Sequence, residues 1–388
     1  MQEDVLTYIS IFSSAGIGCY GFKEEGFECI ATNELLEKRM KIQRYNDKCR
    51  YDSGYILGDI KEKNNYKKIL EAIDFWKIKH NIKNVDVLIA TPPCQGMSVA
   101  NHKKNLNEHI RNSLVIESIK VIKDILPNFI IIENVRSFLN TICTDIDGKD
   151  KKIKDAIDDN LSHLYNLSYN ILNFKDYGCP SSRTRTLIIG VRNTLSICPD
   201  QLLPERTREL PLREVIGNLP SLKVMGEIDN KDLFHSFKRY QTRMLPWIEE
   251  LKEGQSAFDN TDNNKVPHTI KNGTIIFNKK KNADKYRRQY WDKVAPCIHT
   301  RNDILSSQNT IHPNDNRVFS IRELMLMMSI PYSFKWTKYA EDKLNKMPLI
   351  EKQAFLKQEE MNIRQSIGEA VPTIIFKSIA KKIKKFYF

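Results

Sequence analysis

Residues 85–95 read Val85-Asp86-Val87-Leu88-Ile89-Ala90-Thr91-Pro92-Pro93-Cys94-Gln95, and this stretch indicates the fold of the chain. Its first six residues have the length and β-branched content of a buried parallel strand. The two prolines then end the strand and stiffen the chain, because their φ is fixed and they offer no N–H group to a ladder. Open α/β sheets bind ligands just past the carboxyl ends of their strands, so Cys94 is a candidate nucleophile. The alternative is a buried structural cysteine, since free cysteine is among the most buried residue types.

The bulk properties indicate two domains and no membrane span. The chain has 388 residues, which exceeds the size at which one hydrophobic core usually stops growing. No apolar run approaches the roughly 18 residues that a membrane span needs. The first four residues, Met1-Gln2-Glu3-Asp4, lack the basic region and apolar core of a signal peptide, so we expect a cytoplasmic protein.

The cysteines and histidines predict neither a disulfide framework nor a metal site. The eight cysteines are scattered without a C-x-x-C pair, and the eight histidines do not cluster. In a reducing compartment, this pattern supports neither kind of site. We therefore expect no metal.

The formal net charge of +13 favours a polyanionic partner, most simply nucleic acid. The alternative is a lysine-rich solvated surface. Residues 271–301 carry nine Lys or Arg against two Asp, and aromatic residues stand between them: Phe277, Tyr286, Tyr290 and Trp291. Basic residues mixed with aromatics are typical of a phosphate-contacting surface. Arg287, Arg288 and Arg301 are the candidate DNA-binding residues of this stretch.

The first part of the chain predicts a nucleoside pocket. A buried strand at 6–12 is followed by the small-residue turn Ser13-Ser14-Ala15-Gly16-Ile17-Gly18, and a second strand at 26–34 ends in Glu34. Small residues let the backbone approach a ligand, and an acid after the second strand can bind ribose hydroxyls. Asp59 stands at a further strand end, where it can meet an adenine amino group. The turn lacks a full G-x-G-x-x-G, and each acid alone could be a cap or a surface residue.

Further chemical residues follow later strands. Residues 96–112 are polar and predict a mobile loop, and after a helix at 114–126 a buried strand at 128–132 ends in Glu133. The alternative for Glu133 is an acid satisfied by backbone amides at a helix N-terminus. Strands at 168–174 and 186–191 flank Arg183 and Arg185, which alternate so that both can point the same way from an extended segment.

Strands and helices alternate to about residue 195, which predicts a parallel doubly wound sheet. From Pro199 prolines recur and the sequence is irregular to about Asn316, which indicates a second, smaller domain. We expect a catalytic domain at 1–198, completed by 363–388, and a target-recognition domain at 199–362. Within the latter, 317–330 and 339–361 are expected to be helical.

With these residues in view, the chain resembles the DNA cytosine-5 methyltransferases, more narrowly the bacterial modification enzymes of restriction–modification systems. Its matching segments follow the family order and are Phe12-Ser13-Ser14-Ala15-Gly16, Glu34, Asp59, Pro93-Cys94-Gln95, Arg111-Asn112-Ser113-Leu114, Glu133-Asn134-Val135, Arg183-Thr184-Arg185, Arg317 through Arg322-Glu323, and Gly368-Glu369-Ala370-Val371-Pro372. Three positions depart from the family pattern. Ser14 stands for a loop glycine, Ser181 for a glutamine and Glu369 for an asparagine.

The resemblance implies a Rossmann-like, S-adenosylmethionine-dependent methyltransferase sheet with a smaller, irregular target-recognition domain. S-adenosylmethionine, leaving as S-adenosylhomocysteine, is expected to be bound by Phe12, Ala15, Gly16, Ile17, Glu34, Leu35, Asp59, Ile60, Pro92, Leu114, Glu369 and Ala370. Double-stranded DNA is the expected partner, contacted by Gln95, Ser98, Lys103, Lys104, Arg287, Arg288 and Arg301. A monomer paired in function with a cognate restriction endonuclease is expected.

The resemblance also assigns the chemistry. Cytosine C5 is a poor nucleophile until a thiolate adds to C6, and Cys94 is the expected nucleophile. Glu133 is the expected proton donor to N3, which requires that burial or the bound base raise its pKa from about 4.3. Arg185 would hold the cytosine carbonyl, and Arg183 the covalent intermediate or a nearby phosphate.

A duplex hides C6, so the target base must be flipped out at a cost of a few kcal/mol, with loop 96–112 as the lid. Residues 199–316 would read base edges in the major groove, and the insert at 336–362 is a further candidate for this role.

Three alternatives remain at this point. The first is an RNA cytosine-5 methyltransferase of the same fold that acts on tRNA, although the large irregular basic region after Pro199 favours a sequence-reading DNA enzyme. The second is a non-catalytic DNA-binding relative. The third, a small-molecule methyltransferase, fits poorly with a net charge of +13.

Overall fold

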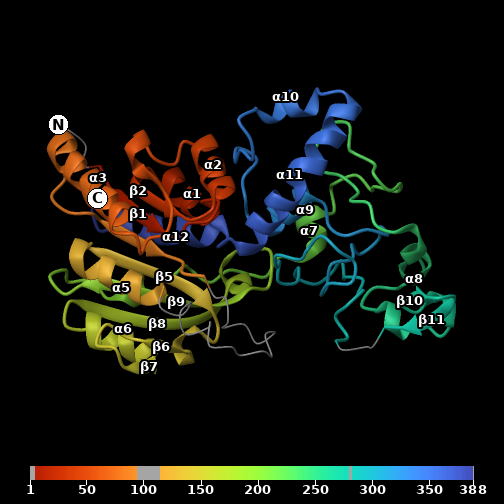
Figure 1. Ribbon diagram of the computed structural model, residues 1–388, viewed down its shortest axis with the longest axis horizontal. Helices are drawn as coiled ribbons and strands as arrows, with labels where there is room; N and C mark the ends of the chain where they lie inside the picture. The colour runs from red at the N-terminus through yellow and green to blue at the C-terminus, as the bar shows by residue number, and fades with distance from the viewer. Residues whose placement is uncertain (1–4, 94–113, 279–281, 388) are drawn as a thin grey trace. The chain divides into compact units, whose positions relative to one another are not determined.

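The structure is a computed structural model, and the residues that it describes are 5–93, 114–278 and 282–387. They form two compact units (Figure 1). The first comprises Met1–Tyr177, Thr184–Thr207 and Ala370–Phe388, and the second comprises Gly178–Arg183 and Arg208–Glu369. Every helix in the described ranges is too short or too polar to cross a lipid bilayer.

The first unit is built on a seven-stranded sheet with the order β3-β2-β1-β4-β5-β9-β8. Its strands are β1 (Thr7–Ile11), β2 (Glu28–Glu34), β3 (Tyr55–Leu57), β4 (Val87–Ala90), β5 (Phe129–Val135), β8 (Tyr165–Asn173) and β9 (Thr184–Arg192). Neighbours from β3 through β5 are parallel. β9, in contrast, runs antiparallel to both β5 and β8. This direction corrects the expectation of a wholly parallel sheet, because a buried apolar strand has the same composition in either direction.

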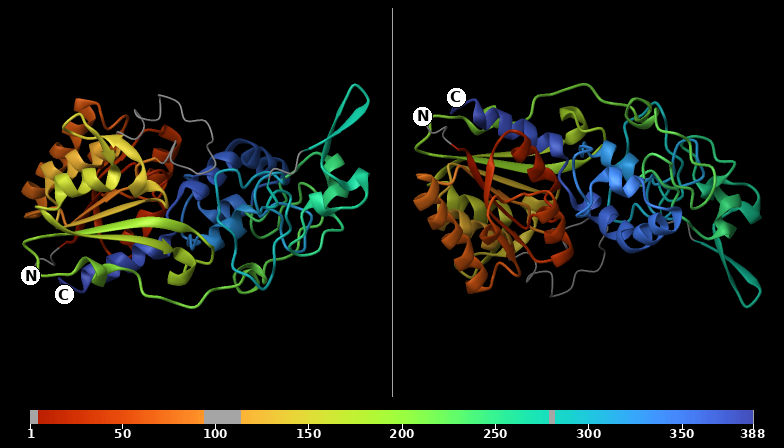
Figure 2. Two further views of the ribbon diagram at one scale, coloured as in Figure 1. Left: turned by 90° about the horizontal axis from the view of Figure 1, so that it is seen from below. Right: turned by 90° about the horizontal axis from the view of Figure 1, so that it is seen from above.

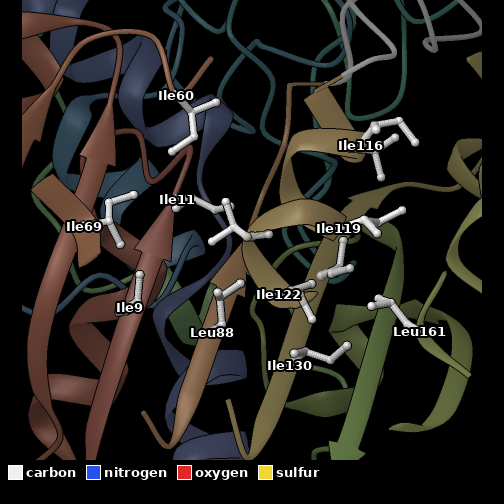
Figure 3. Close-up of a cluster of buried hydrophobic side chains, with 14 of the residues drawn as sticks. Ile9, Ile11, Ile60, Ile69, Leu88, Ile116, Ile119, Ile122, Ile130 and Leu161 are labelled. Carbon is white, nitrogen blue, oxygen red and sulfur yellow. The ribbon is translucent and has the colours of Figure 1, made fainter. Parts of the chain in front are cut away.

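Helices cover both faces of this sheet. They are α1 (Ile17–Glu24), α2 (Glu37–Tyr45), α3 (Lys63–His80), α5 (Leu114–Ile125), α6 (Ile153–Leu161) and α12 (Thr373–Lys384), and a small hairpin, β6 (Ile142–Thr144) and β7 (Asp150–Lys152), precedes α6. The main core lies between the strands and helices α3, α5 and α6. Its members include Ile9, Ile11, Ile69, Leu88, Ile119, Ile122, Ile130 and Leu161 (Figure 3).

The opposite face of the sheet packs on α1 and α12 (Figure 2). Tyr8 alternates with Ile9 along β1 and therefore points to this face, where its ring lies 5.5 Å from that of Phe22. The two helices approach so closely that a Cβ added to Gly21 would lie 2.6 Å from the Thr373 carbonyl oxygen. The C-terminal helix is thereby part of the unit that begins with β1.

The second unit has few regular elements. They are α7 (Leu212–Ile216), α8 (Leu245–Ile248), β10 (His268–Lys271), β11 (Thr274–Phe277), α9 (Ile321–Met327), α10 (Glu341–Asn345) and α11 (Leu349–Glu369). The expected helix at 317–330 is shorter than predicted, because Ser320 and Glu323 form a capping box that starts α9 at Ile321. The helical stretch expected at 339–361 is divided into α10 and α11.

Buried arginines hold this second unit together. Arg317 pairs with Asp315 at 2.9 Å and with Glu323 at 2.7 Å. Arg322 pairs with Asp232 and Glu341, and Arg364 donates to Glu360 at 2.8 Å, all three arginines being fully buried. A guanidinium that is both paired and hydrogen-bonded in this way offsets the cost of burying its charge.

Candidate active site

The corner after β4 is held from two sides. The Thr91 hydroxyl donates to the Phe12 carbonyl oxygen at 2.9 Å, on the turn that follows β1. The Asn134 side-chain amide donates to the Pro92 carbonyl oxygen at 2.8 Å, at the end of β5. Side-chain hydrogen bonds as well as the two prolines therefore hold the backbone that leads into Cys94. Cys94, Gln95, Ser98, Lys103 and Lys104 themselves, with the expected lid, lie outside the described residues.

Glu133 and Arg185 come together at the same edge. The Arg185 Nε atom lies 3.2 Å from Glu133 Oε1, and the two side chains are 16% and 8% exposed. Because β9 is antiparallel to β5, the first residues of β9 lie beside the last residues of β5. A parallel β9 would have placed Arg185 at the other edge of the sheet, so the reversed direction brings the acid and the cation into one site.

Arg183 is placed differently. It belongs to the second unit and is buried there. Its Nη1 atom donates to the Ile298 carbonyl oxygen at 2.9 Å, and both Nη atoms lie 3.3 Å from the Gly368 carbonyl oxygen. The two arginines therefore belong to different units, and their common orientation stays a prediction.

The turn between β1 and α1 has an unusual backbone. Phe12, Ser14 and Gly16 have positive φ angles of 57°, 46° and 76°. The left-handed conformation is uncommon for the two non-glycine residues, so other contacts must hold it. Glu34 provides one of them, since its Oε2 atom accepts from the Ser14 N–H at 2.7 Å and its Oε1 atom from the Leu36 N–H at 2.9 Å.

A buried polar network supports the turn from below. The Gln43 side-chain amide donates to the Ser14 carbonyl oxygen at 2.6 Å and to the Ser13 hydroxyl at 3.1 Å. The Lys48 ammonium donates to the Ser10 hydroxyl at 2.6 Å and to the Thr32 hydroxyl at 2.9 Å, and Thr32 in turn donates to Gln43 Oε1 at 2.7 Å. Neither Gln43, in α2, nor Lys48, just after it, could be recognised from the sequence, because polar residues in and beside a helix normally face solvent.

The surroundings of the turn fit an adenosine moiety. Leu35, Leu36 and Leu57 are 63%, 50% and 44% exposed, which offers apolar side chains to a flat base. Asp59 is partly exposed near them, although its Oδ1 atom already accepts from the Lys61 N–H at 3.0 Å. Apolar side chains beside a few carboxylates are typical of nucleoside pockets, so the residues present fit S-adenosylmethionine.

The remaining expected cofactor residues have varied positions. Ala15, Gly16, Ile17, Ile60, Pro92 and Ala370 are buried, whereas Phe12 and Leu114 are partly exposed. Glu369 is the exposed last residue of α11 and belongs to the second unit.

The expected DNA-binding arginines differ in exposure. Arg301 is exposed and bonded to Asp303 at 3.1 Å, and Arg287 is partly exposed and paired with Asp284 at 3.3 Å. Arg288 is only 3% exposed. Its guanidinium donates to backbone carbonyl oxygens of Ile248, His312 and Asp315 and to the side chain of Asn316. Arg288 is thus a core residue of the second unit, and the sequence could not distinguish it from its neighbour Arg287.

Comparison with known proteins gives consistent results. The sequence model of the C-5 cytosine-specific DNA methylase family matches residues 6–385. The chain is 31% identical to the type II methyltransferase M1.HgaI of Avibacterium volantium, covering 99% of each chain. It is 27% identical to the type II methyltransferase M1.HphI of Haemophilus parahaemolyticus, covering 98% of this chain and 87% of the relative.

Solved structures with little sequence identity share the fold. A DNA modification methyltransferase encoded within an E. coli prophage has a TM-score of 0.65 at 16% identity, covering 98% of this chain and 99% of that chain. The Dnmt2 methyltransferase of S. pombe has a TM-score of 0.59 at 13% identity, covering 99% and 100%.

Proposed function

The chain belongs to the C-5 cytosine-specific DNA methylase family, and we propose that Cys94, Glu133 and Arg185 form its active site. It is a DNA methyltransferase of the restriction–modification type, which methylates C5 of cytosine through base flipping and a covalent adduct. The observation that carries the proposed site is the Glu133–Arg185 contact of 3.2 Å at the edge where the tethered corner of Thr91–Pro93 leads into Cys94.

In the proposed mechanism, the Cys94 thiolate forms a bond to C6 of the flipped cytosine, and electron density moves toward N3 and C5. In the complex with the base, Arg185 donates to the cytosine carbonyl oxygen, and Glu133, which must carry a proton there, passes it to N3 as the S–C6 bond forms and takes it back when that bond breaks. A base then removes the proton from C5 of the methylated ring, the S–C6 bond breaks, and the thiolate leaves.

The first unit would hold the methyl donor around the β1–α1 turn. S-adenosylmethionine, when bound, supplies an electrophilic methyl group. Glu34 would accept hydrogen bonds from ribose hydroxyls, Asp59 from the adenine amino group, and Leu35 would cover one face of the base. The Gln43–Lys48 network keeps the turn in its left-handed conformation beneath the ligand.

We also propose that the second unit recognises the target sequence. Basic residues such as the exposed Arg301 and the partly exposed Arg287 would contact phosphates, which orient a protein on DNA. The buried Arg183 and Arg288 would act by holding the backbone of this unit. We propose that the protein acts as a monomer paired in function with a cognate endonuclease.

Methyl transfer tests the proposal. With labelled S-adenosylmethionine and unmethylated duplex DNA, Cys94→Ser should lose incorporation, whereas substitution of the exposed Cys198 by serine should not. Glu133→Gln should lower kcat about 10²–10⁴-fold, as expected for a general acid, while DNA binding persists. Label in tRNA alone, or full activity in Cys94→Ser, would contradict the proposal.

A further inference from the structure

The second unit carries a small hairpin that forms a sheet of its own. β10 and β11 are antiparallel, and within the described residues they have no further strand partner. The turn Asn272-Gly273 has φ angles of 48° and 76°, the two successive positive values that a type I′ turn requires. The strands pair His268 with Phe277 at the base and Lys271 with Thr274 at the tip.

The hairpin exposes an unusual amount of apolar surface. Ile270 is 61% exposed, and Ile275, Ile276 and Phe277 are 44%, 46% and 46% exposed. Figure 2 shows the hairpin, in teal, projecting from the rest of the second unit in both views. Ile270 and Ile275 share one face, because they are cross-strand partners, and Ile276 lies on the other. Both faces are therefore open.

The base of the hairpin is fixed, unlike its tip. The ring of Trp247, which is buried in the core of this unit, lies 5.4 Å from that of His268. Arg243 Nη1 donates to the His268 carbonyl oxygen at 2.9 Å, and the Asn278 N–H donates to the Pro267 carbonyl oxygen at 2.9 Å. An isolated hairpin is at best marginally stable in water. The contacts at its base stabilise this hairpin, so its exposed isoleucine side chains are not needed for that purpose.

The composition favours a nucleic-acid partner. Residues 268–277 contain Lys271 and no acidic residue. The major groove of DNA admits a two-stranded β-ribbon, and a ribbon lying in the groove presents the side chains of one face to the base edges. Isoleucine side chains can contact the C5-methyl group of thymine, which distinguishes A·T pairs in the major groove.

We propose that the β10–β11 hairpin enters the major groove of duplex DNA and reads base edges through Ile270 and Ile275, which share one face, with Lys271 on a phosphate. This assignment rests on the proposed function, since it makes the hairpin a specificity element of the same methyltransferase. It predicts that at least one recognised position is an A·T pair.

A library experiment tests the hairpin. The full-length enzyme would methylate a randomised duplex library, and bisulfite sequencing would give the preferred context. In Ile270→Ser/Ile275→Ser, which leaves no methyl group on this face, discrimination at an A·T position should fall roughly tenfold while kcat is retained. Ile270→Val/Ile275→Val should keep the preference. Ile78→Ser, at an 86% exposed position on α3, is the matched control and should change nothing.

Lys271→Gln separates charge from base reading. It should weaken binding equally on preferred and other sequences and reduce the salt dependence of log K by about one. An unchanged context in the double serine variant of an active enzyme overturns the hairpin assignment alone. Dimerisation of the wild type that the serine pair abolishes, measured by sedimentation, would likewise overturn it in favour of a second copy as the occupant. A wild-type enzyme that methylates no DNA would instead contradict the proposed function.

Discussion

The two units of this protein are stabilised in different ways. In the first, main-chain groups pair in a seven-stranded sheet whose core is formed by aliphatic side chains such as Ile9 and Ile130. In the second, regular elements are short, and the largest fully buried side chains include Arg317, Arg322 and Arg364. The first unit is organised by strand pairing around an apolar core, and the second combines a smaller apolar core with buried charge.

The difference shows what replaces a sheet when the backbone is irregular. Buried carbonyl groups need donors, which a strand ladder supplies in the first unit. In the second, guanidinium groups supply them, since each carries five N–H donors. Arg288 reaches three backbone carbonyl oxygens, and Arg183 reaches two. These contacts support a structural role for such arginines in a basic chain, while the catalytic and DNA-binding roles expected of Arg183 and Arg288 stay predictions.

The largest effect is expected from Arg317→Met. Arg317 contacts both Asp315 and Glu323, and its loss leaves two buried carboxylates without their cation. We expect the second unit to lose about 3–5 kcal/mol of its free energy of unfolding. Hydrogen exchange followed by mass spectrometry should show faster exchange in peptides of 310–327 and unchanged exchange in β5.

Two variants control this result. Arg208→Met removes an exposed pair with Glu214 and should change exchange little, because solvent screens such pairs. Arg317→Met/Glu323→Gln should recover part of the loss, since it removes one of the orphaned charges. Equal exchange in Arg317→Met and the wild type would contradict the view that buried charge organises this unit.

The sequence predicted the first unit well because its signals are local. Apolar runs at 85–90 and 128–132 became β4 and β5, and Glu133 stands near the end of a strand as expected. Strand direction could not be predicted, since it depends on pairing between distant residues. The direction of β9 determines whether Arg185 lies beside Glu133, because only an antiparallel β9 begins where β5 ends.

The rest of the site and of the second unit could not be predicted for a related reason. Gln43 and Lys48 support the β1–α1 turn through contacts with Ser14, Ser10 and Thr32, which are 11 to 38 residues away. A polar residue that is buried among hydrogen-bond partners is the same amino acid as one exposed to solvent, so the sequence alone does not distinguish the two. Arg287 and Arg288 are neighbours in sequence, yet one is partly exposed and the other buried.

A smaller effect, limited to one pH range, is expected from His312. Burial lowers the pKa of His312 to about 4, and Glu323, Arg317, Asp315 and Arg288 surround it. Its Nδ1 atom accepts from the Asp315 N–H at 2.9 Å, as a neutral ring can. Between about pH 6.5 and 4 the unfolded chain takes up a proton that the folded unit does not. The free energy of unfolding therefore decreases as the pH is lowered, by up to about 3 kcal/mol.

Hydrogen exchange across this pH range should therefore accelerate in the second unit relative to the first, after correction for intrinsic rates. His312→Asn, which cannot take up the proton, should flatten the difference between the units. A wild-type profile in which both units lose protection in parallel would show that His312 is not the source.

The smallest effect is expected from Ile9→Val in the first unit. Ile9 is fully buried in β1, beneath the helices that cover the main core (Figure 3). Removing one methylene costs about 0.5–1.5 kcal/mol, and valine keeps the preference for a strand. Because no charge is involved, the loss should be the same at pH 7 and pH 5 and should appear only in the first unit's peptides. Ile78→Thr, exposed on α3, should show no loss at either pH. A loss in Ile9→Val that grew on acidification would mean that titrating groups also stabilise the sheet, and the contrast between the two units would then be one of degree.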